Sequence, residues 1–291
     1  MFNSFLKVYL VSILVMFPSF LLTCELASNP SRITVAGGSI TEILYFLNEE
    51  DKIIAIDVTS NYPKDVKKYP SIGYVRNLSA EGILSLNPTL IIGEDDMGPQ
   101  NVINQINRTG VEINILTEKH SSEGIIEKIQ CIGEIIGRKD KANLLIKDKI
   151  LPKKIELDEL SQLLKDLDIK VMFILNMDSG SPIVGGRETS ADGFIEMMGV
   201  KNAFNSFEGW KPVGIESIIK ASPDYILISN RGAHSFGNIE MLNNHHAIKH
   251  TPAAKNNNII ALDGMEMLGF GPRTINTALK LSNKFLNNHN E

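Results

Sequence analysis

A tyrosine and an arginine stand two residues apart in the segment GYVRNLSAEG, which covers residues 73–82. A deprotonated phenol is a hard, anionic ligand that suits ferric iron. An arginine beside it favours the deprotonated phenol, and its guanidinium also binds carboxylates. A ferric haem presents both targets, an iron and its propionates. These residue types make Tyr74 a candidate iron ligand and Arg76 a candidate partner for a propionate.

The composition is that of an ordinary globular protein. The chain has 291 residues, of which 43% are hydrophobic and 22% charged, and its formal net charge is -5. This length is enough for one large or two modest hydrophobic cores. A surface that binds nucleic acid would need an excess of basic residues, so we expect no nucleic-acid partner.

The first 23 residues differ from the rest. Lys7 is the only charged residue before Glu25, and an apolar stretch follows it over residues 8–22. A positive start followed by an apolar run predicts an export signal over residues 1–23, and hence a periplasmic protein. A membrane anchor is the alternative, but Pro18 and the short apolar run count against it.

The two cysteines have separate expected fates. The sequence LLTC at residues 21–24 resembles the site at which bacterial lipoproteins are lipidated, although Thr23 stands where a smaller residue is usual. A cut a few residues later, which removes Cys24, is equally consistent with the sequence. Because either fate leaves Cys131 alone in an apolar helical pattern, we expect a buried, unpaired Cys131 and no disulfide.

Short apolar runs alternate with helical patterns along the chain, as in parallel α/β sheets. In the first half, strands are predicted at 32–36, 53–57, 90–93 and 113–116, and helices at 40–47, 81–86, 99–108 and 121–136. In the second half, strands are predicted at 170–175, 225–228 and 258–262, with a last helix at 274–287. The boundaries that follow are an N-terminal lobe over 31–138, a linking helix region over 139–168 and a C-terminal lobe over 169–291.

An internal repeat supports two similar lobes. Glu81 and Glu216 each begin a short helical pattern, and a proline follows each glutamate by seven residues, directly before a strand. Proline ends a helix and directs the chain onward. The predicted fold class is therefore α/β, with two doubly wound lobes joined by a single long helix and a ligand cleft between the lobes.

Four segments resemble the periplasmic haem-binding proteins of bacterial haem ABC importers, within the helical-backbone class of substrate-binding proteins. They are AGGSITE at 36–42, TSNYP at 59–63, GYVRNLSAEG at 73–82 and GFGPRT at 269–274. The first two occur more widely in the class, whereas the third is fairly specific to the haem binders. The resemblance covers essentially the whole chain after the export signal.

The resemblance implies a function, a cargo and a partner. It implies a protein that captures haem in the periplasm and delivers it to the permease dimer of an ABC importer, with little hinge motion. It further implies that Tyr74 ligates the haem iron, that Arg76 lies close to the haem, and that Glu81 and Glu216 dock onto basic residues of the permease.

Five further residues are candidates for the cleft because they follow predicted strands, whose ends line the clefts of α/β proteins. In the second lobe, Arg231 is a candidate propionate contact and His234 a candidate second axial ligand. Met177 is a candidate either to pack on the porphyrin or to ligate the iron, and ordinary core packing is the alternative. In the first lobe, Thr59 and Tyr62 are candidates to line the cleft, although Tyr62 before a proline equally suits a turn.

Other functions fit the sequence less well. A ferric siderophore or a cobalamin-type corrinoid is the main alternative ligand on the same fold. A zinc or manganese site needs several converging histidines and carboxylates, and the first lobe offers only His120. No nucleophile elbow, P-loop or zinc-hydrolase motif occurs, so we predict neither an enzyme nor catalytic residues. Arg273 is expected to pair with an acidic neighbour rather than to join the site.

Overall fold

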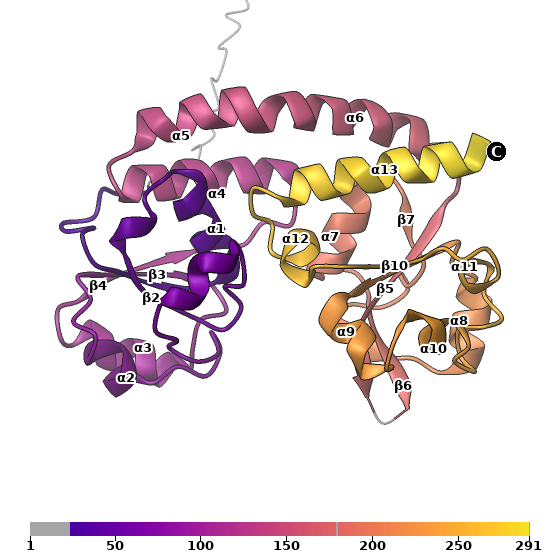
Figure 1. Cartoon of the computed structure of the whole chain (residues 1–291), viewed down its shortest axis with the longest axis horizontal. Coiled ribbons are helices and arrows are strands. Elements are labelled where there is room, and N and C mark those ends of the chain that lie inside the picture. Colours follow the sequence, from indigo (N-terminus) through magenta and orange to yellow (C-terminus); the bar gives the residue numbers. More distant parts are fainter. Residues whose placement is uncertain (1–23, 179, 291) are drawn as a thin grey trace, which may run out of the picture.

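The computed structural model describes residues 24–178 and 180–290, and the predicted export signal lies outside them. Figure 1 shows two α/β lobes side by side beneath a layer of long helices. Within the described ranges, no helix is both long and apolar enough to span a membrane. The prediction of two α/β lobes with a helical connection is confirmed.

The first lobe is built on a parallel sheet with the strand order β2-β1-β3-β4. Its strands are β1 (Ile33–Ala36), β2 (Ile53–Ile56), β3 (Leu90–Glu94) and β4 (Glu112–Leu116). Its helices are α1 (Gly38–Phe46), α2 (Ala80–Leu84), α3 (Gln100–Asn107) and α4 (Ser122–Ile135), with short 3-10 turns at Glu50–Lys52 and Lys64–Lys68. The central strands β1 and β3 are short and apolar because helices cover both faces of the sheet, whereas β4 at the edge is only partly buried.

One helical rod connects the lobes. It consists of α5 (Lys139–Leu145), a single π-helical stretch (Ile146–Ile150) and α6 (Leu151–Lys165). Pro152 lies in the first turn of α6, directly after the π-helical stretch. Because proline lacks an N–H group and its ring crowds the preceding turn, the wider π turn lets the helix continue past it.

The second lobe has a mixed sheet. Its strands follow the order β10-β9-β5-β6-β8, with β7 paired to β5. They are β5 (Lys170–Asp178), β6 (Ser181–Gly185), β7 (Lys201–Asn202), β8 (Trp210–Pro212), β9 (Tyr225–Ser229) and β10 (Ile259–Leu262). The pairs β5–β6 and β6–β8 are antiparallel, an edge that the sequence analysis did not predict.

The helices of the second lobe are mostly short. They are α7 (Ser190–Met197), α8 (Ile215–Ala221), α9 (Asn230–Ser235), α10 (Ile239–Asn243), α11 (Pro252–Lys255), α12 (Gly264–Leu268) and the long α13 (Thr274–Asn290). The two copies of the internal repeat also share a backbone conformation. Asn87 after α2 and Ser222 after α8 both have a positive φ, and each directly precedes a proline and the next strand.

One hydrophobic core runs through both lobes. It joins side chains of β1, α1 and α4 to those of α6, and continues to β5, α7 and α13. A separate cluster covers the other face of each sheet. In Figure 1, α6 and α13 lie side by side above the lobes, and they are in contact. Because the core is shared, opening the lobes would expose apolar surface, which favours a stiff connection.

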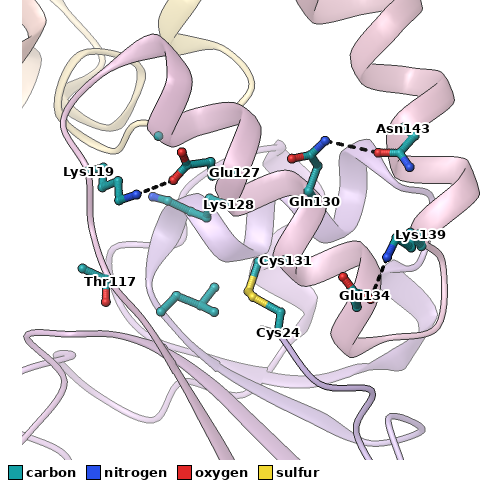
Figure 2. Close-up of a pocket in the computed structure, with 12 residues that line it drawn as sticks. Cys24, Thr117, Lys119, Glu127, Lys128, Gln130, Cys131, Glu134, Lys139 and Asn143 are labelled. Carbon is teal, nitrogen blue, oxygen red and sulfur yellow. Dashed lines mark hydrogen bonds and ion pairs between the residues drawn. A yellow bond between two sulfur atoms is a disulfide. The ribbon is translucent and has the colours of Figure 1, made fainter. Parts of the chain in front are cut away.

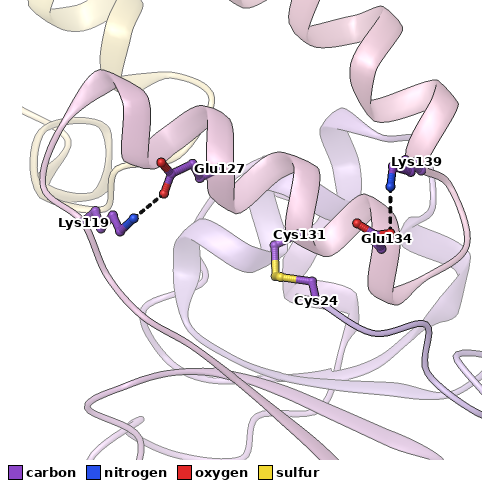
Figure 3. Close-up of a disulfide and its surroundings, with 6 residues drawn as sticks. All are labelled: Cys24, Lys119, Glu127, Cys131, Glu134 and Lys139. Carbon is purple, nitrogen blue, oxygen red and sulfur yellow. Dashed lines mark hydrogen bonds and ion pairs between the residues drawn. A yellow bond between two sulfur atoms is a disulfide. The ribbon is translucent and has the colours of Figure 1, made fainter. Parts of the chain in front are cut away.

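The expectation of an unpaired Cys131 is wrong. Cys24 and Cys131 form a disulfide, with their Cα atoms 5.2 Å apart, and it joins the chain before β1 to the middle of α4 (Figure 3). Cys131 is buried as expected. The pairing was missed because Cys24 was expected either to carry a lipid or to be removed with the export signal.

Candidate functional site

Tyr74 and Arg76 lie in a tight turn whose backbone is fixed on both sides. Val58 N–H donates to the Gly73 carbonyl at 2.9 Å, and Gly98 N–H donates to the Val75 carbonyl at 2.9 Å. The side chain of Val75 is buried in the core of the first lobe, whereas Tyr74 and Arg76 on either side of it are exposed. The alternation presents the phenol and the guanidinium together on the surface.

Arg76 already has a carboxylate partner. Its Nε and Nη2 atoms lie 2.7 and 2.6 Å from Asp96 Oδ2, and its guanidinium carbon lies 5.9 Å from the centre of the Tyr74 ring. Burial works to lower the pKa of Arg76, but the hydrogen bond to Asp96 and the nearby negative charges together outweigh it, and the pKa is raised. A ligand carboxylate that binds Arg76 must therefore share it with Asp96 or displace Asp96.

Thr59 and Tyr62 occupy the loop after β2. The Thr59 hydroxyl donates to Asp57 Oδ2 at 2.7 Å and accepts from Gly38 N–H at 2.9 Å, so it holds this loop to the start of α1. The Tyr62 ring is stacked under the Arg273 guanidinium, 3.9 Å from its carbon, and remains 45% exposed.

Arg231 and His234 lie on α9, which begins directly after β9 and is capped by the Ser229 hydroxyl. Both residues follow the strand predicted at 225–228, but no helix was predicted at this position. Both side chains are exposed, and residues three apart share one face of a helix. In Figure 1, α9 lies on the side of the second lobe that faces the first lobe.

Met177 was predicted to follow a strand. It lies instead within β5, opposite Pro182 on β6. The strand is longer than the apolar run predicted because it continues into a hairpin. Met177 is half-buried and packs against the core of the second lobe, as in the ordinary packing alternative.

Glu81 and Glu216 are exposed in the first turns of α2 and α8. Each belongs to a different lobe, and neither forms an ion pair among the described residues. Acidic residues at a helix N-terminus are favoured by the helix dipole, so both positions hold a carboxylate readily.

A buried ion pair joins the lobes. Arg273, just before α13, binds Glu42 of α1 in a bidentate manner, with Nε–Oε2 and Nη2–Oε1 distances of 2.9 and 2.5 Å. Burial raises the pKa of Glu42, although the bonds to Arg273 oppose this shift. The expectation that Arg273 pairs with an acidic residue is confirmed.

A second polar cluster that the sequence analysis missed surrounds Lys128. The buried Lys128 ammonium donates to Glu118 Oε2 at 2.5 Å, to Ser39 Oγ at 3.0 Å and to the Gly269 carbonyl at 3.3 Å. The Ser39 hydroxyl donates to Glu94 Oε1 at 2.8 Å. Desolvation, together with the charge of Glu118, raises the pKa of Glu94 to about 8.

The buried polar groups and the exposed polar groups lie in different parts of the molecule. The pairs around Arg273 and Lys128 join α1, α4 and the segment before α13, so they fix the lobes relative to one another. The turn with Tyr74 and the helix α9 carry exposed groups on separate lobes. Among the described residues, no group of three or more histidines, cysteines, aspartates and glutamates is arranged to hold a metal ion directly.

A cavity of about 400 Å³ lies elsewhere, beside α4 (Figure 2). The disulfide, the end of β4 and the charged side chains Lys119, Glu127 and Glu134 line it. None of the residues predicted for the ligand site is among its lining, so it is not the cleft predicted from the sequence.

Comparison with known proteins decides the family. The periplasmic binding protein family matches residues 33–265. This chain belongs to the periplasmic binding proteins. Members of this family are substrate-binding proteins of ABC transporters and not enzymes.

Solved structures of similar fold include several haem-binding proteins. The periplasmic heme-binding protein RhuT from Roseiflexus sp. RS-1, in its apo form, is 32% identical with a TM-score of 0.79, over 87% of this chain and 96% of that chain. The periplasmic heme-binding protein HutB of Vibrio cholerae is 30% identical with a TM-score of 0.78, over 88% and 99% of the two chains.

Relatives found by sequence carry other names. A vitamin B12-binding protein from Vibrio parahaemolyticus is 24% identical over 272 residues, which cover 92% of this chain and 94% of the relative. An uncharacterised ABC transporter substrate-binding lipoprotein, YvrC of Bacillus subtilis, is 26% identical over 204 residues. That match covers 69% of this chain and 64% of the lipoprotein.

Proposed function

We propose that this protein captures haem in the periplasm and delivers it to the permease of an ABC importer. The observation that carries the proposal is the turn at residues 73–78, which presents an exposed phenol beside an exposed guanidinium. Solved proteins of similar fold, at about 30% identity, are named for haem binding, which supports haem as the cargo.

In this proposal Tyr74 ligates the haem iron. A tyrosinate is an established axial ligand of ferric haem, and the nearby Arg76 charge favours the deprotonated phenol. Arg76 and, from the second lobe, Arg231 bind the propionates through charge-assisted hydrogen bonds. His234 on the same face of α9 lies on the lobe opposite Tyr74, and Thr59 and Tyr62 border the site from the loop after β2.

Delivery requires that the permease contact both lobes at once. Glu81 and Glu216 are exposed on different lobes and lie at equivalent positions of the internal repeat. We assign them to docking on basic residues of a dimeric permease, where complementary charge would set the orientation of the complex. The shared core and the buried ion pair at Arg273 favour lobes that keep their relative position during delivery.

A cobalamin-type corrinoid is the second candidate ligand. A relative that matches 92% of this chain by sequence is named for vitamin B12 binding. Such a ligand would be held by aromatic and basic side chains without a bond from the protein to iron. Tyr74, Tyr62 and Arg231 supply those side chain types as well.

Parallel titrations with hemin and with cyanocobalamin test the proposal. We expect saturable binding of hemin only, with the charge-transfer absorption band of a high-spin tyrosinate complex. In Tyr74→Ala, the band disappears and most of the affinity is lost. Saturable binding of cyanocobalamin without hemin binding would establish the second candidate instead. Hemin binding with an unchanged spectrum in Tyr74→Ala would move the ligand search to His234.

A further inference from the structure

The segment before β1 is an integral part of the first lobe. Ala27 is buried in the shared core, and its N–H donates to the Ile135 carbonyl in the last turn of α4 at 2.9 Å. Ser28 N–H donates to Glu112 Oε2 on β4 at 2.9 Å. The bond from Ala27 satisfies one of the carbonyls that a helix leaves unpaired at its C-terminus.

The disulfide fastens the start of this segment. Figure 3 shows the sulfur of Cys24 joined to that of Cys131 on the side of α4, next to the ion pair between Lys139 and Glu134. The Cα–Cα distance of 5.2 Å lies in the range that a disulfide spans without backbone movement. Cys24 also packs against the shared core, so its side chain is directed into the protein.

The same sulfur is the atom that a lipid anchor would use. Residues 21–24 resemble a lipidation site, and a lipid would attach to Cys24 through a thioether at Sγ. A sulfur in a disulfide has no thiolate available for that bond, so the two modifications exclude each other. The departure at Thr23 from the usual small residue weakens the site for lipidation.

We infer that Cys24 is retained in the mature chain as the disulfide partner of Cys131 and carries no lipid. The export signal is then cut before residue 24, and the protein is released from the membrane. The bond forms when the two thiols give up two protons and two electrons to the disulfide of a thiol oxidoreductase, which becomes a dithiol. An exported protein meets such oxidants in its compartment.

This inference distinguishes the chain from its relative YvrC, which is named as a lipoprotein. It rests on export, which is part of the proposed function, but not on the identity of the ligand. Cys24 then forms a disulfide with Cys131 instead of carrying a lipid. The N-terminal segment is held against α4 and β4 rather than extended toward a membrane.

The chemical state of Cys24 is tested on the full chain expressed with its own signal. The soluble exported fraction and the membrane fraction are collected, and each is alkylated with iodoacetamide before and after reduction. Intact mass and peptide mapping then locate the modifications. We expect the protein in the soluble fraction, alkylation at both cysteines only after reduction, and a linked peptide pair that contains residues 24 and 131.

The variant Cys131→Ser provides the matched control, since it leaves Cys24 as a single thiol that should react without reduction. A diacylglyceryl group on Cys24, with Cys131 reactive before reduction, would overturn the inference. A mature chain that begins after residue 24, or two thiols reactive without reduction, would overturn it as well. None of these readouts uses haem, so the outcome is independent of the titrations.

Discussion

Two sets that each combine a tyrosine, an arginine and a carboxylate differ in their surroundings. Tyr74, Arg76 and Asp96 form one set on the first lobe, and Tyr62, Arg273 and Glu42 form the other where the lobes meet. In both, an arginine is paired with a carboxylate and lies over a tyrosine ring, at 5.9 Å in the first and 3.9 Å in the second. The two tyrosines are almost equally exposed, at 44% and 45%.

The two arginines differ far more than the tyrosines. The Arg76 side chain is 61% exposed, whereas that of Arg273 is 20% exposed and its partner Glu42 only 4%. Arg76 binds a single carboxylate oxygen, whereas Arg273 binds both oxygens of Glu42. An exposed pair exchanges partners at little cost, but a buried bidentate pair does not. Exposure, rather than residue type, therefore separates the set proposed to bind the ligand from the set that joins the lobes.

The largest expected effect comes from breaking the buried set. Arg273→Met leaves the Glu42 carboxylate buried without its partner, and we expect a loss of about 3 kcal/mol in the free energy of unfolding. The matched change Arg76→Met removes an exposed pair and should cost less than about 1 kcal/mol. Urea denaturation measures both. Equal losses in the two variants would contradict the distinction between the sets.

The second effect concerns ligand binding, and here the larger loss is expected in the exposed set. Tyr74→Phe removes only the phenolic oxygen, and we expect hemin affinity to fall about 100-fold, or about 2.8 kcal/mol. Tyr62→Phe keeps the ring under Arg273 and should change the affinity by less than about threefold, or about 0.7 kcal/mol. Hemin titrations followed by absorption compare the two. A larger loss in Tyr62→Phe than in Tyr74→Phe would place the iron ligand in the set with Arg273 and contradict the proposal.

A third prediction uses pH to separate the buried polar groups from the exposed ones. The pKa of Glu94 is about 8 in the folded protein and 4.5 as a free group. A raised carboxyl pKa stabilises the fold below about pH 4.5, and this contribution is lost as the pH rises through 8. Stability should therefore fall with pH over that window, by at most about 1.4 kcal/mol per pH unit.

Glu94→Gln removes this titration and keeps an acceptor for the Ser39 hydroxyl, so its stability should depend less on pH. Asp168→Asn, which removes an exposed carboxylate paired with Lys201, serves as the control. The pKa of Asp168 is lowered by that pair and lies below this pH range, so the slope of the wild type should remain unchanged. Urea denaturation between pH 5 and pH 8 gives both slopes. If the slope survives in Glu94→Gln, another group is responsible for it.

The sequence predicted those features that depend on local pattern. Short apolar runs identified the parallel strands because helices cover both faces of each sheet, and the segment at 73–82 identified the exposed turn by resemblance. Features that join distant residues were missed. The disulfide links cysteines 107 residues apart, and the cluster around Lys128 gathers groups from α1, β3, α4 and the segment before α13.

One missed residue did have a local signal. Glu94 is the last residue of β3, directly after the predicted strand at 90–93, and side chains at that edge of an α/β sheet approach the switch point of the fold. Its raised pKa, however, depends first on desolvation and then on the charge of Glu118, which only the packed structure supplies. Met177 shows the opposite case, because its strand continues into a hairpin that apolar periodicity does not predict.

The smallest predicted effect tests whether Asp96 competes with the ligand for Arg76. Asp96→Asn removes the charge that holds the guanidinium but leaves the turn at residues 73–78 anchored by its backbone bonds. A freed Arg76 can bind a haem propionate without displacing a carboxylate, so hemin affinity should rise about threefold, or about 0.7 kcal/mol. The double variant Asp96→Asn with Arg76→Met should lose this gain. A lower affinity in the single variant would mean that Asp96 instead positions Arg76 for the ligand, as Glu42 positions Arg273 over Tyr62.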